Sequence, residues 1–254
     1  MKLNYQTFGT GRPLIILHGL FGSSDNWRNI AKQMAEKALI IAVDLRNHGR
    51  SPHSVEQTYA LMADDLFELL NDLNLDKVDM IGHSMGGKVA MAFSQYYPQR
   101  LNKLVVVDIA PRAYMDGHSE IFRSLLAIDL SLYATRNEVD EVLKKTLTDK
   151  AVRLFLLMNL ELRNGQLCWR INLQGLNDTY PHMLKAVCED EMIMLPICFI
   201  RGELSTYIID EDEDLIRAIY PYSEIYTIEQ AGHWLHADKP QQFLTKISEF
   251  FEYA

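Results

Sequence analysis

Short apolar runs alternate along most of the chain with segments whose apolar residues recur at helical spacing. The runs contain four to six residues, which is typical of buried strands rather than buried helices. Segments with apolar residues every three to four positions follow most of them and predict amphipathic helices. The predicted strands are 3–8, 13–17, 39–43, 77–81, 104–107, 196–200 and 223–228. This alternation predicts an α/β fold with a mostly parallel central sheet and helices on both faces.

The alternation stops between about Arg112 and Glu191. This stretch shows three helical patterns and no buried strand, and Asn164-Gly165 is suited to turning a small hairpin. Alternation then resumes at residue 196. We therefore expect a core formed by residues 1–111 and 192–254, and an inserted helical cap formed by residues 112–191.

A reactive serine is predicted at Ser84. The sequence Gly82-His-Ser-Met-Gly86 lies between the strand at 77–81 and a helix that runs to about Tyr97. A G-x-S-x-G sequence in that setting is typical of a nucleophile elbow, a sharp turn that holds the serine hydroxyl above the sheet. Residues 82–88 also fit the start of a phosphate-binding loop, but Val89 stands where that loop needs a hydroxyl for Mg²⁺. The nucleophile interpretation is therefore preferred.

A base for this serine is expected in another loop at the same edge of the sheet. A serine hydroxyl is a weak nucleophile and needs an adjacent base. His233 follows the last predicted strand, and the carboxyl ends of parallel strands share one edge. His236, three residues later, is the less favoured alternative. His18, His48 and His83 are interpreted as structural loop residues.

Four motifs together resemble the α/β-hydrolase fold superfamily over nearly the whole chain. They are His18-Gly19, Asp44-x-Arg-x-His-Gly-x-Ser51, the serine motif and Gly232-His233. Three further stretches resemble the small bacterial acyl esterases and thioesterases of the YbfF type: Leu20-Phe-Gly22, Asp108-Ile-Ala-Pro111 and Trp169-Arg-Ile-Asn172. The resemblance implies an oxyanion hole formed by the backbone amides of Met85 and Leu20.

The acid of the implied catalytic triad is displaced in this sequence. The superfamily's usual aspartate lies three residues after a glycine that corresponds to Gly202, and here that position is Ser205. A serine cannot carry the charge that stabilises an imidazolium. Asp108, at the end of the strand after the elbow, is the expected substitute, as in the YbfF type. Glu203 is the alternative.

Composition narrows the set of partners. The chain has 254 residues, 48% of them apolar, and a net charge of −9, with no Lys/Arg cluster longer than two residues. These features argue against nucleic acid and stable membrane association. No apolar stretch approaches a membrane span, and residues 1–7 do not resemble a signal peptide. Three unpatterned cysteines indicate reduced thiols and a cytoplasmic location. No metal or cofactor is expected, and monomer and dimer both stay open.

The expected function is hydrolysis of short-to-medium acyl esters or thioesters by a serine esterase or thioesterase. Ser84, His233 and Asp108 would act through an acyl-enzyme, and Phe21, Phe122 and Leu126 are expected to contact the substrate. A carbon–carbon bond hydrolase or an acyltransferase would use the same triad. A ligand-binding member of the fold without catalysis is a further alternative, suggested by the missing aspartate at position 205.

Overall fold

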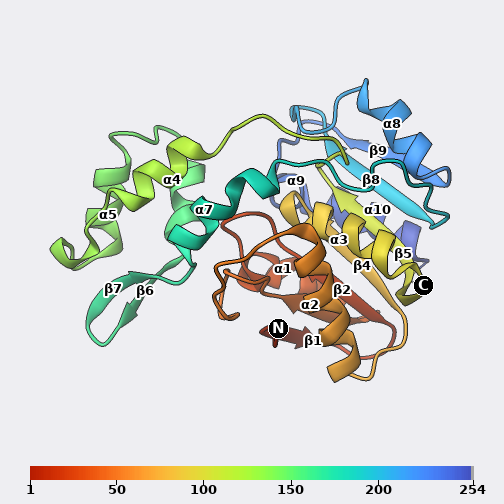
Figure 1. The fold of residues 1–254 in the computed structure, drawn as a ribbon, viewed down its shortest axis with the longest axis horizontal. Helices are drawn as coiled ribbons and strands as arrows, with labels where there is room; N and C mark the ends of the chain where they lie inside the picture. The colour runs from red at the N-terminus through yellow and green to blue at the C-terminus, as the bar shows by residue number, and fades with distance from the viewer. Residues whose placement is uncertain (253–254) are drawn as a thin grey trace.

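The computed structural model describes residues 1–252, and its centre is a seven-stranded sheet (Figure 1). The strand order is β1-β3-β2-β4-β5-β8-β9, and β1 is antiparallel while the other six strands are parallel. The predicted mostly parallel sheet is confirmed. The strands are β1 (Tyr5–Phe8), β2 (Pro13–Leu17), β3 (Leu39–Val43), β4 (Val78–His83), β5 (Leu101–Val107), β8 (Ile197–Gly202) and β9 (Ser223–Ile228).

Helices cover both faces of the sheet and form two hydrophobic cores. One core packs beneath α2 (Tyr59–Asp72), α3 (Met85–Tyr96) and α8 (Asp212–Ile219), and the other beneath α1 (Arg28–Met34) and α10 (Pro240–Phe251). Every residue of β4 is buried, which explains why its sequence lacks the alternation of a half-exposed strand. The short elements of the core are η1 (Ser24–Trp27), η2 (Pro98–Arg100) and α9 (Leu235–Asp238).

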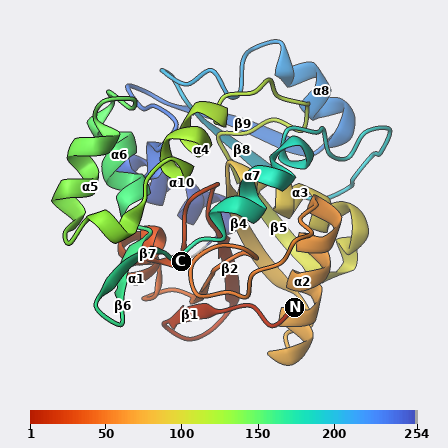
Figure 2. The same cartoon turned by 60° about the vertical axis from the view of Figure 1, so that its left-hand side comes forward.

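The segment between β5 and β8 forms a mostly helical cap beside the sheet, as Figure 2 shows. Its elements are α4 (Ser119–Leu126), η3 (Leu130–Leu132), α5 (Arg136–Leu143), α6 (Lys150–Leu157), the hairpin β6–β7 (Leu160–Arg163 and Gln166–Trp169) and α7 (Leu173–Met183). The predicted hairpin is confirmed. The sequence gives no indication of α7, because Gly175 and the internal Pro181 both weaken its helical pattern.

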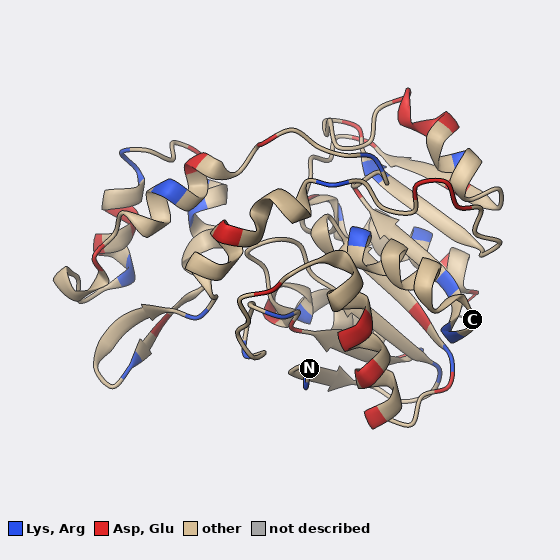
Figure 3. Cartoon of the chain, viewed as in Figure 1, with Lys and Arg blue, Asp and Glu red and all other residues tan. Residues whose placement is uncertain are grey.

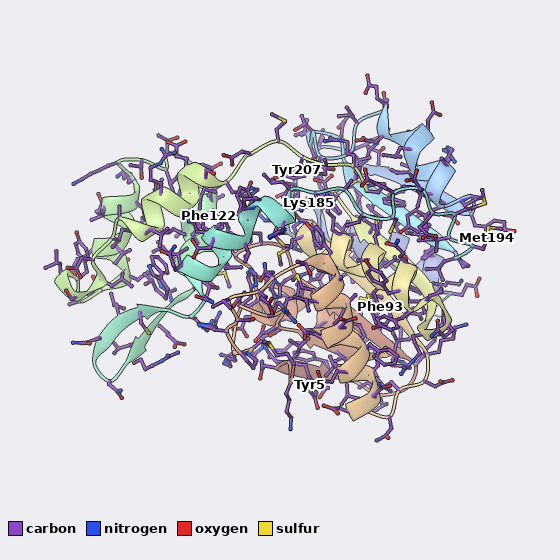
Figure 4. The ribbon with its side chains drawn as sticks, viewed as in Figure 1. Tyr5, Phe93, Phe122, Lys185, Met194 and Tyr207 are labelled. Carbon is purple, nitrogen blue, oxygen red and sulfur yellow. The ribbon has the colours of Figure 1, made fainter. Side chains whose placement is uncertain are left out.

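The cap leaves and rejoins the core through two chain segments that are hydrogen-bonded to each other. Val187 N–H donates to the Pro111 carbonyl at 2.9 Å, and Tyr114 N–H donates to the Leu184 carbonyl at 2.8 Å. We call these paired segments, residues 111–114 and 184–187, the neck. Figure 4 labels Lys185 in the neck and Tyr207 in the core.

Charged side chains of both signs are distributed over core and cap, with acidic residues concentrated along α2 and at the start of α8 (Figure 3). Within the described residues 1–252, no helix has both the length and the apolar character needed to cross a membrane.

Candidate active site

Ser84 occupies a strained turn between the fully buried strand β4 and helix α3. Its φ of 52° and ψ of −121° lie outside the backbone regions that residues other than glycine ordinarily adopt. The turn also brings backbone segments together, so that a Cβ on Gly82 would lie 2.3 Å from the Gly86 carbonyl oxygen. A Cβ on Gly86 would lie 2.5 Å from the His18 carbonyl oxygen. Both glycines are therefore sterically required at the elbow.

Asp108 and His233 are directly hydrogen-bonded. His233 Nδ1 lies 2.7 Å from Asp108 Oδ2, with the carboxylate fully buried and the imidazole partly exposed. A carboxylate in this position accepts a hydrogen bond from Nδ1–H and leaves Nε2 as the free proton acceptor. Asp108 follows β5 with a φ of 52°, a left-handed conformation that aspartate tolerates better than most residues.

Ser205 stands at the position where the superfamily usually has its acid, and its side chain is hydrogen-bonded to Asp108. Ser205 Oγ–H donates to the same Asp108 Oδ2 at 2.5 Å, and Gly202 N–H donates to Oδ1 at 3.2 Å. Glu203, the alternative acid, accepts a hydrogen bond from the Gln230 amide at 2.7 Å. Its carboxylate is therefore engaged away from His233, while the buried Asp108 carboxylate has donors on both oxygens.

Of the two residues expected to form the oxyanion hole, Met85 follows Ser84 in the chain and Leu20 lines the same cavities as Ser84. Met85 is the first residue of α3, where a helix leaves N–H groups without intrahelical acceptors. Leu20 and Ser84 line two cavities in common. The neighbouring Phe21 N–H is already used, since it donates to His48 Nε2 at 3.3 Å. This favours Leu20 over Phe21 as the second donor.

The buried histidines around the elbow are held by backbone hydrogen bonds or, at His236, by ring stacking. His18 Nδ1–H donates to the Gly19 carbonyl, and its Nε2 accepts from Leu45 N–H. His83 Nε2–H donates to the His233 carbonyl and so fixes the loop that carries His233. His236 stacks on Trp27 with ring centroids 4.3 Å apart, within the core. These contacts agree with structural roles for all three.

Burial keeps these rings neutral and links stability to pH. It lowers the pKa of His48 and of His236 to about 3, and it lowers the pKa values of His18 and His83 as well. Between pH 6.5 and 3 the unfolded chain therefore binds more protons at these sites than the folded protein. Their contribution to stability is complete above pH 6.5 and is lost as the pH falls towards 3.

Replacing His48 with glutamine is expected to reduce this acid sensitivity. A glutamine carbonyl can still accept the Phe21 amide but cannot take up a proton. The fall in unfolding free energy between pH 6 and pH 4 should become shallower by up to about 1.4 kcal/mol per pH unit. Urea denaturation at several pH values measures this slope, with the exposed His53→Gln as control. An unchanged slope in His48→Gln would contradict the assignment of His48 as a buried neutral ring.

Two cavities meet at Ser84. The first, which we call the His233 chamber, has a volume of about 220 Å³. Its wall contains His233 and Trp234 of the core, Phe21 of the oxyanion loop, and Ile121 and Phe155 of the cap. Phe21 is therefore placed where the sequence predicts a substrate contact. Apolar and aromatic side chains dominate this wall, which suits an apolar substrate group.

The second cavity, the Lys88 chamber, has a volume of about 340 Å³. It shares Leu20, Ser84, His118 and Tyr207 with the first cavity. Its remaining wall comes from the core, the neck and α7: Tyr59, Met85, Lys88, Ile109, Arg112, Tyr114, Met115, Gly117, Tyr180, Met183, Leu184 and Thr206. A substrate attacked by Ser84 thus has room on both sides of the hydroxyl.

Two of the expected substrate contacts need correction. Phe122 is fully buried and packs behind Phe21, with ring centroids 4.8 Å apart, so it supports the chamber wall without lining it. Leu126 is 40% exposed and lines a separate surface hollow. The helix α4 turns Ile121 towards Ser84 instead. Helical periodicity identifies an apolar face but does not show which apolar residue reaches a cavity.

Three residues near Ser84 are absent from the sequence-based prediction of the site. Tyr207 stacks on His233 with ring centroids 3.9 Å apart, and His118 lies in the walls of both chambers. Lys88 lies one helical turn after Ser84 on α3. The sequence contains indications of two of them: Tyr207 follows a strand at the reactive edge of the sheet, and Lys88 is the one charged residue of a mostly apolar helix.

In the described chain, no three His, Cys, Asp or Glu side chains are grouped so as to hold a metal ion.

Comparison with known proteins identifies the family of this chain. The family model for the alpha/beta hydrolase fold matches residues 12–162. The chain is 38% identical to the "sn-1-specific diacylglycerol lipase ABHD11" of Danio rerio, with 99% of this chain and 83% of the relative covered. It is 37% identical to "Esterase YbfF" of Escherichia coli, with coverage of 98% and 99%. A solved structure described as "Marine microorganism esterase" superimposes with a TM-score of 0.96 at 41% identity, covering 98% of this chain and 99% of that one.

These relatives extend over almost the whole chain, and their names agree on one kind of chemistry. The resemblance to esterases of the YbfF type is therefore confirmed. The chain has a strained serine at the end of a buried central strand, and these relatives are named as esterases or lipases. The chain belongs to the α/β-hydrolase fold family and is a carboxylic ester hydrolase.

Proposed function

We propose that the protein is a serine esterase that cleaves acyl esters and acyl thioesters of short to medium chain length. The observation that carries this proposal is the 2.7 Å contact between His233 and the buried Asp108, in a chamber whose wall also contains Ser84. This arrangement has the members of a nucleophile, base and acid triad. The volumes of the two chambers, about 220 and 340 Å³, suit small acyl groups.

The reaction proceeds in two steps on this arrangement. Ser84 Oγ forms a bond to the acyl carbon while His233 Nε2 takes the hydroxyl proton, and the Met85 and Leu20 amides stabilise the oxyanion. The bond to the leaving group then breaks as His233 returns the proton to the leaving atom. A water molecule, deprotonated by His233, hydrolyses the acyl-enzyme and regenerates Ser84. Asp108 keeps the His233 tautomer correct throughout.

A fluorophosphonate probe and a substrate panel together test the proposal. The probe should label the native protein on Ser84 but not the heat-unfolded protein, because only an activated serine reacts. The panel consists of p-nitrophenyl esters and coenzyme A thioesters of increasing acyl chain length. Turnover should be measurable in both series and fall for long chains. Hydrolysis of oxygen esters alone would remove the thioesterase part of the proposal, and failure of the native protein to label would contradict the whole.

Replacing Phe155 with alanine should change substrate preference more than chemistry. Phe155 lies in the wall of the His233 chamber and packs against Trp234, with ring centroids 5.4 Å apart. Loss of its ring should raise KM for well-fitting esters about tenfold, within the range expected for lost apolar contacts in a pocket. Leu126→Ala, outside the chamber, is the matched control. Equal effects of the two substitutions would show that Phe155 does not contact the substrate.

A further inference from the structure

We infer that the two chambers receive different halves of the substrate. This step rests on the proposed function, since the leaving atom must lie within reach of the proton carried by His233. His233 and Trp234 belong to the wall of the His233 chamber, whereas the wall of the Lys88 chamber contains Met85 and Ile109 and does not contain His233. On this inference the leaving group extends into the His233 chamber, and the acyl chain extends from Ser84 into the Lys88 chamber.

The acyl chamber contains a buried cation. Lys88 is 1% exposed, and its Nζ donates to the Arg112 carbonyl at 2.7 Å and to the Lys185 carbonyl, both in the neck. The ammonium lies 4.9 Å from the centre of the Tyr114 ring and 5.7 Å from that of Tyr59. Carbonyl dipoles and ring faces stabilise a cation, and the two carbonyl contacts use two of its three N–H donors.

No carboxylate of residues 1–252 forms an ion pair with Lys88. The other cation of the chamber wall, Arg112, does have such a partner, because its Nε lies 2.7 Å from Asp212 Oδ1. Burial and the Arg112 charge lower the pKa of Lys88 to about 7, and the more weakly acting Glu189 carboxylate opposes this shift without forming an ion pair. A buried charge without a counter-ion is costly, and in a substrate cavity it is a mark of a functional site.

Lys88 and Ser84 lie in the wall of the same chamber, so an acyl group attached to Ser84 shares this cavity with the Lys88 side chain. We propose that the Lys88 chamber selects acyl groups that end in a carboxylate, which accepts a hydrogen bond from the Lys88 ammonium.

A matched pair of substrates tests this inference. The 4-nitrophenyl monoesters of adipic acid and hexanoic acid share a leaving group and the number of acyl carbons, and differ in the terminal carboxylate. The wild-type protein should hydrolyse the adipoyl ester with kcat/KM about 10- to 100-fold higher, as expected for a hydrogen bond between charged groups. Free adipate should also inhibit more strongly than free hexanoate.

Lys88→Met then locates the effect. Methionine keeps much of the side-chain volume but removes the charge, so the preference for the adipoyl ester should disappear while the hexanoyl ester is still hydrolysed. Lys103→Met is the matched control, because Lys103 Nζ also donates to a backbone carbonyl and lies over an aromatic ring, but at Phe250, outside both chambers. It should keep the wild-type preference.

The outcomes separate this inference from the proposed function. A wild-type protein that hydrolyses both esters equally, and is inhibited equally by both acids, overturns the inference and leaves the esterase proposal intact. Lys88 would then serve only to hold the two segments of the neck together through its hydrogen bonds to the Arg112 and Lys185 carbonyls. Failure to hydrolyse either ester, together with no fluorophosphonate labelling, overturns the proposed function itself. Because the inhibition measurement uses only the wild-type protein, the inference stays testable even if Lys88→Met does not fold.

Discussion

Replacing Ser84 with alanine is expected to lower kcat for ester hydrolysis by about 10⁴- to 10⁶-fold, the loss usual for a nucleophile of this type. The hydroxyl supplies the attacking atom, and no other side chain at the elbow can replace it. The strained backbone does not depend on the Oγ atom, so the melting temperature should stay close to that of the wild type. Stopped assays with p-nitrophenyl butyrate and thermal unfolding measure the two quantities.

Ser94→Ala is the matched control for this experiment. Ser94 is also a buried serine of α3, but its hydroxyl donates to the Met91 carbonyl, one helical turn away. It should retain activity within a few fold of the wild type. Near-normal turnover by Ser84→Ala would contradict the proposed nucleophile. His233→Gln should match the loss in Ser84→Ala, whereas His236→Gln should not, because His236 packs on Trp27.

Replacing Asp108 with asparagine is expected to lower kcat by about 10³- to 10⁴-fold, by analogy with loss of the acid in other serine triads. The side chain keeps its shape, but its amide nitrogen is a donor and cannot accept a hydrogen bond from His233 Nδ1–H. The favoured tautomer then places the proton on Nε2, where it blocks the removal of the Ser84 proton. The kcat of the purified variant on one ester, at saturating substrate, measures the effect.

Glu203→Gln decides between the two candidate acids. Glu203 lies in the loop after β8, the usual place of the acid, but its carboxylate accepts the Gln230 amide. Its amide analogue can keep that bond, so kcat should change by less than about threefold, a shift of under 1 kcal/mol. A large loss in Glu203→Gln with little loss in Asp108→Asn would return the acid to the loop after β8.

The fold and the turn that carries Ser84 were predictable because each depends on a local rule. Buried parallel strands need continuous apolar runs, and the elbow needs Gly82 and Gly86 for steric reasons that the structure makes explicit. Asp108 could be proposed because Ser205 cannot ionise, although the bond from Ser205 to Asp108 was not foreseen. That bond depends on the loop after β8 folding back onto β5, which no local pattern encodes.

The cap was less predictable because its side chains are arranged by tertiary packing. Phe122 and Leu126 share an apolar helical pattern, yet one packs behind Phe21 and the other faces solvent. Lys88 was considered only as part of a nucleotide-binding motif, and its position in the acyl chamber depends on the neck carbonyls it contacts. The direction of a side chain within a cavity is set by neighbours distant in sequence.

The neck holds the two ends of the inserted cap segment close together. The Pro111 carbonyl and the Val187 amide are 2.9 Å apart, so the chain returns to the place where it left. The entropy lost in closing a loop grows only slowly with its length, and here the ends of the loop are already fixed by the core. The length and sequence of the inserted segment can therefore change over evolution with little effect on the folding of the sheet. The two hydrogen-bonded segments of the neck are thus a junction at which a different substrate-facing segment can be inserted without altering the sheet.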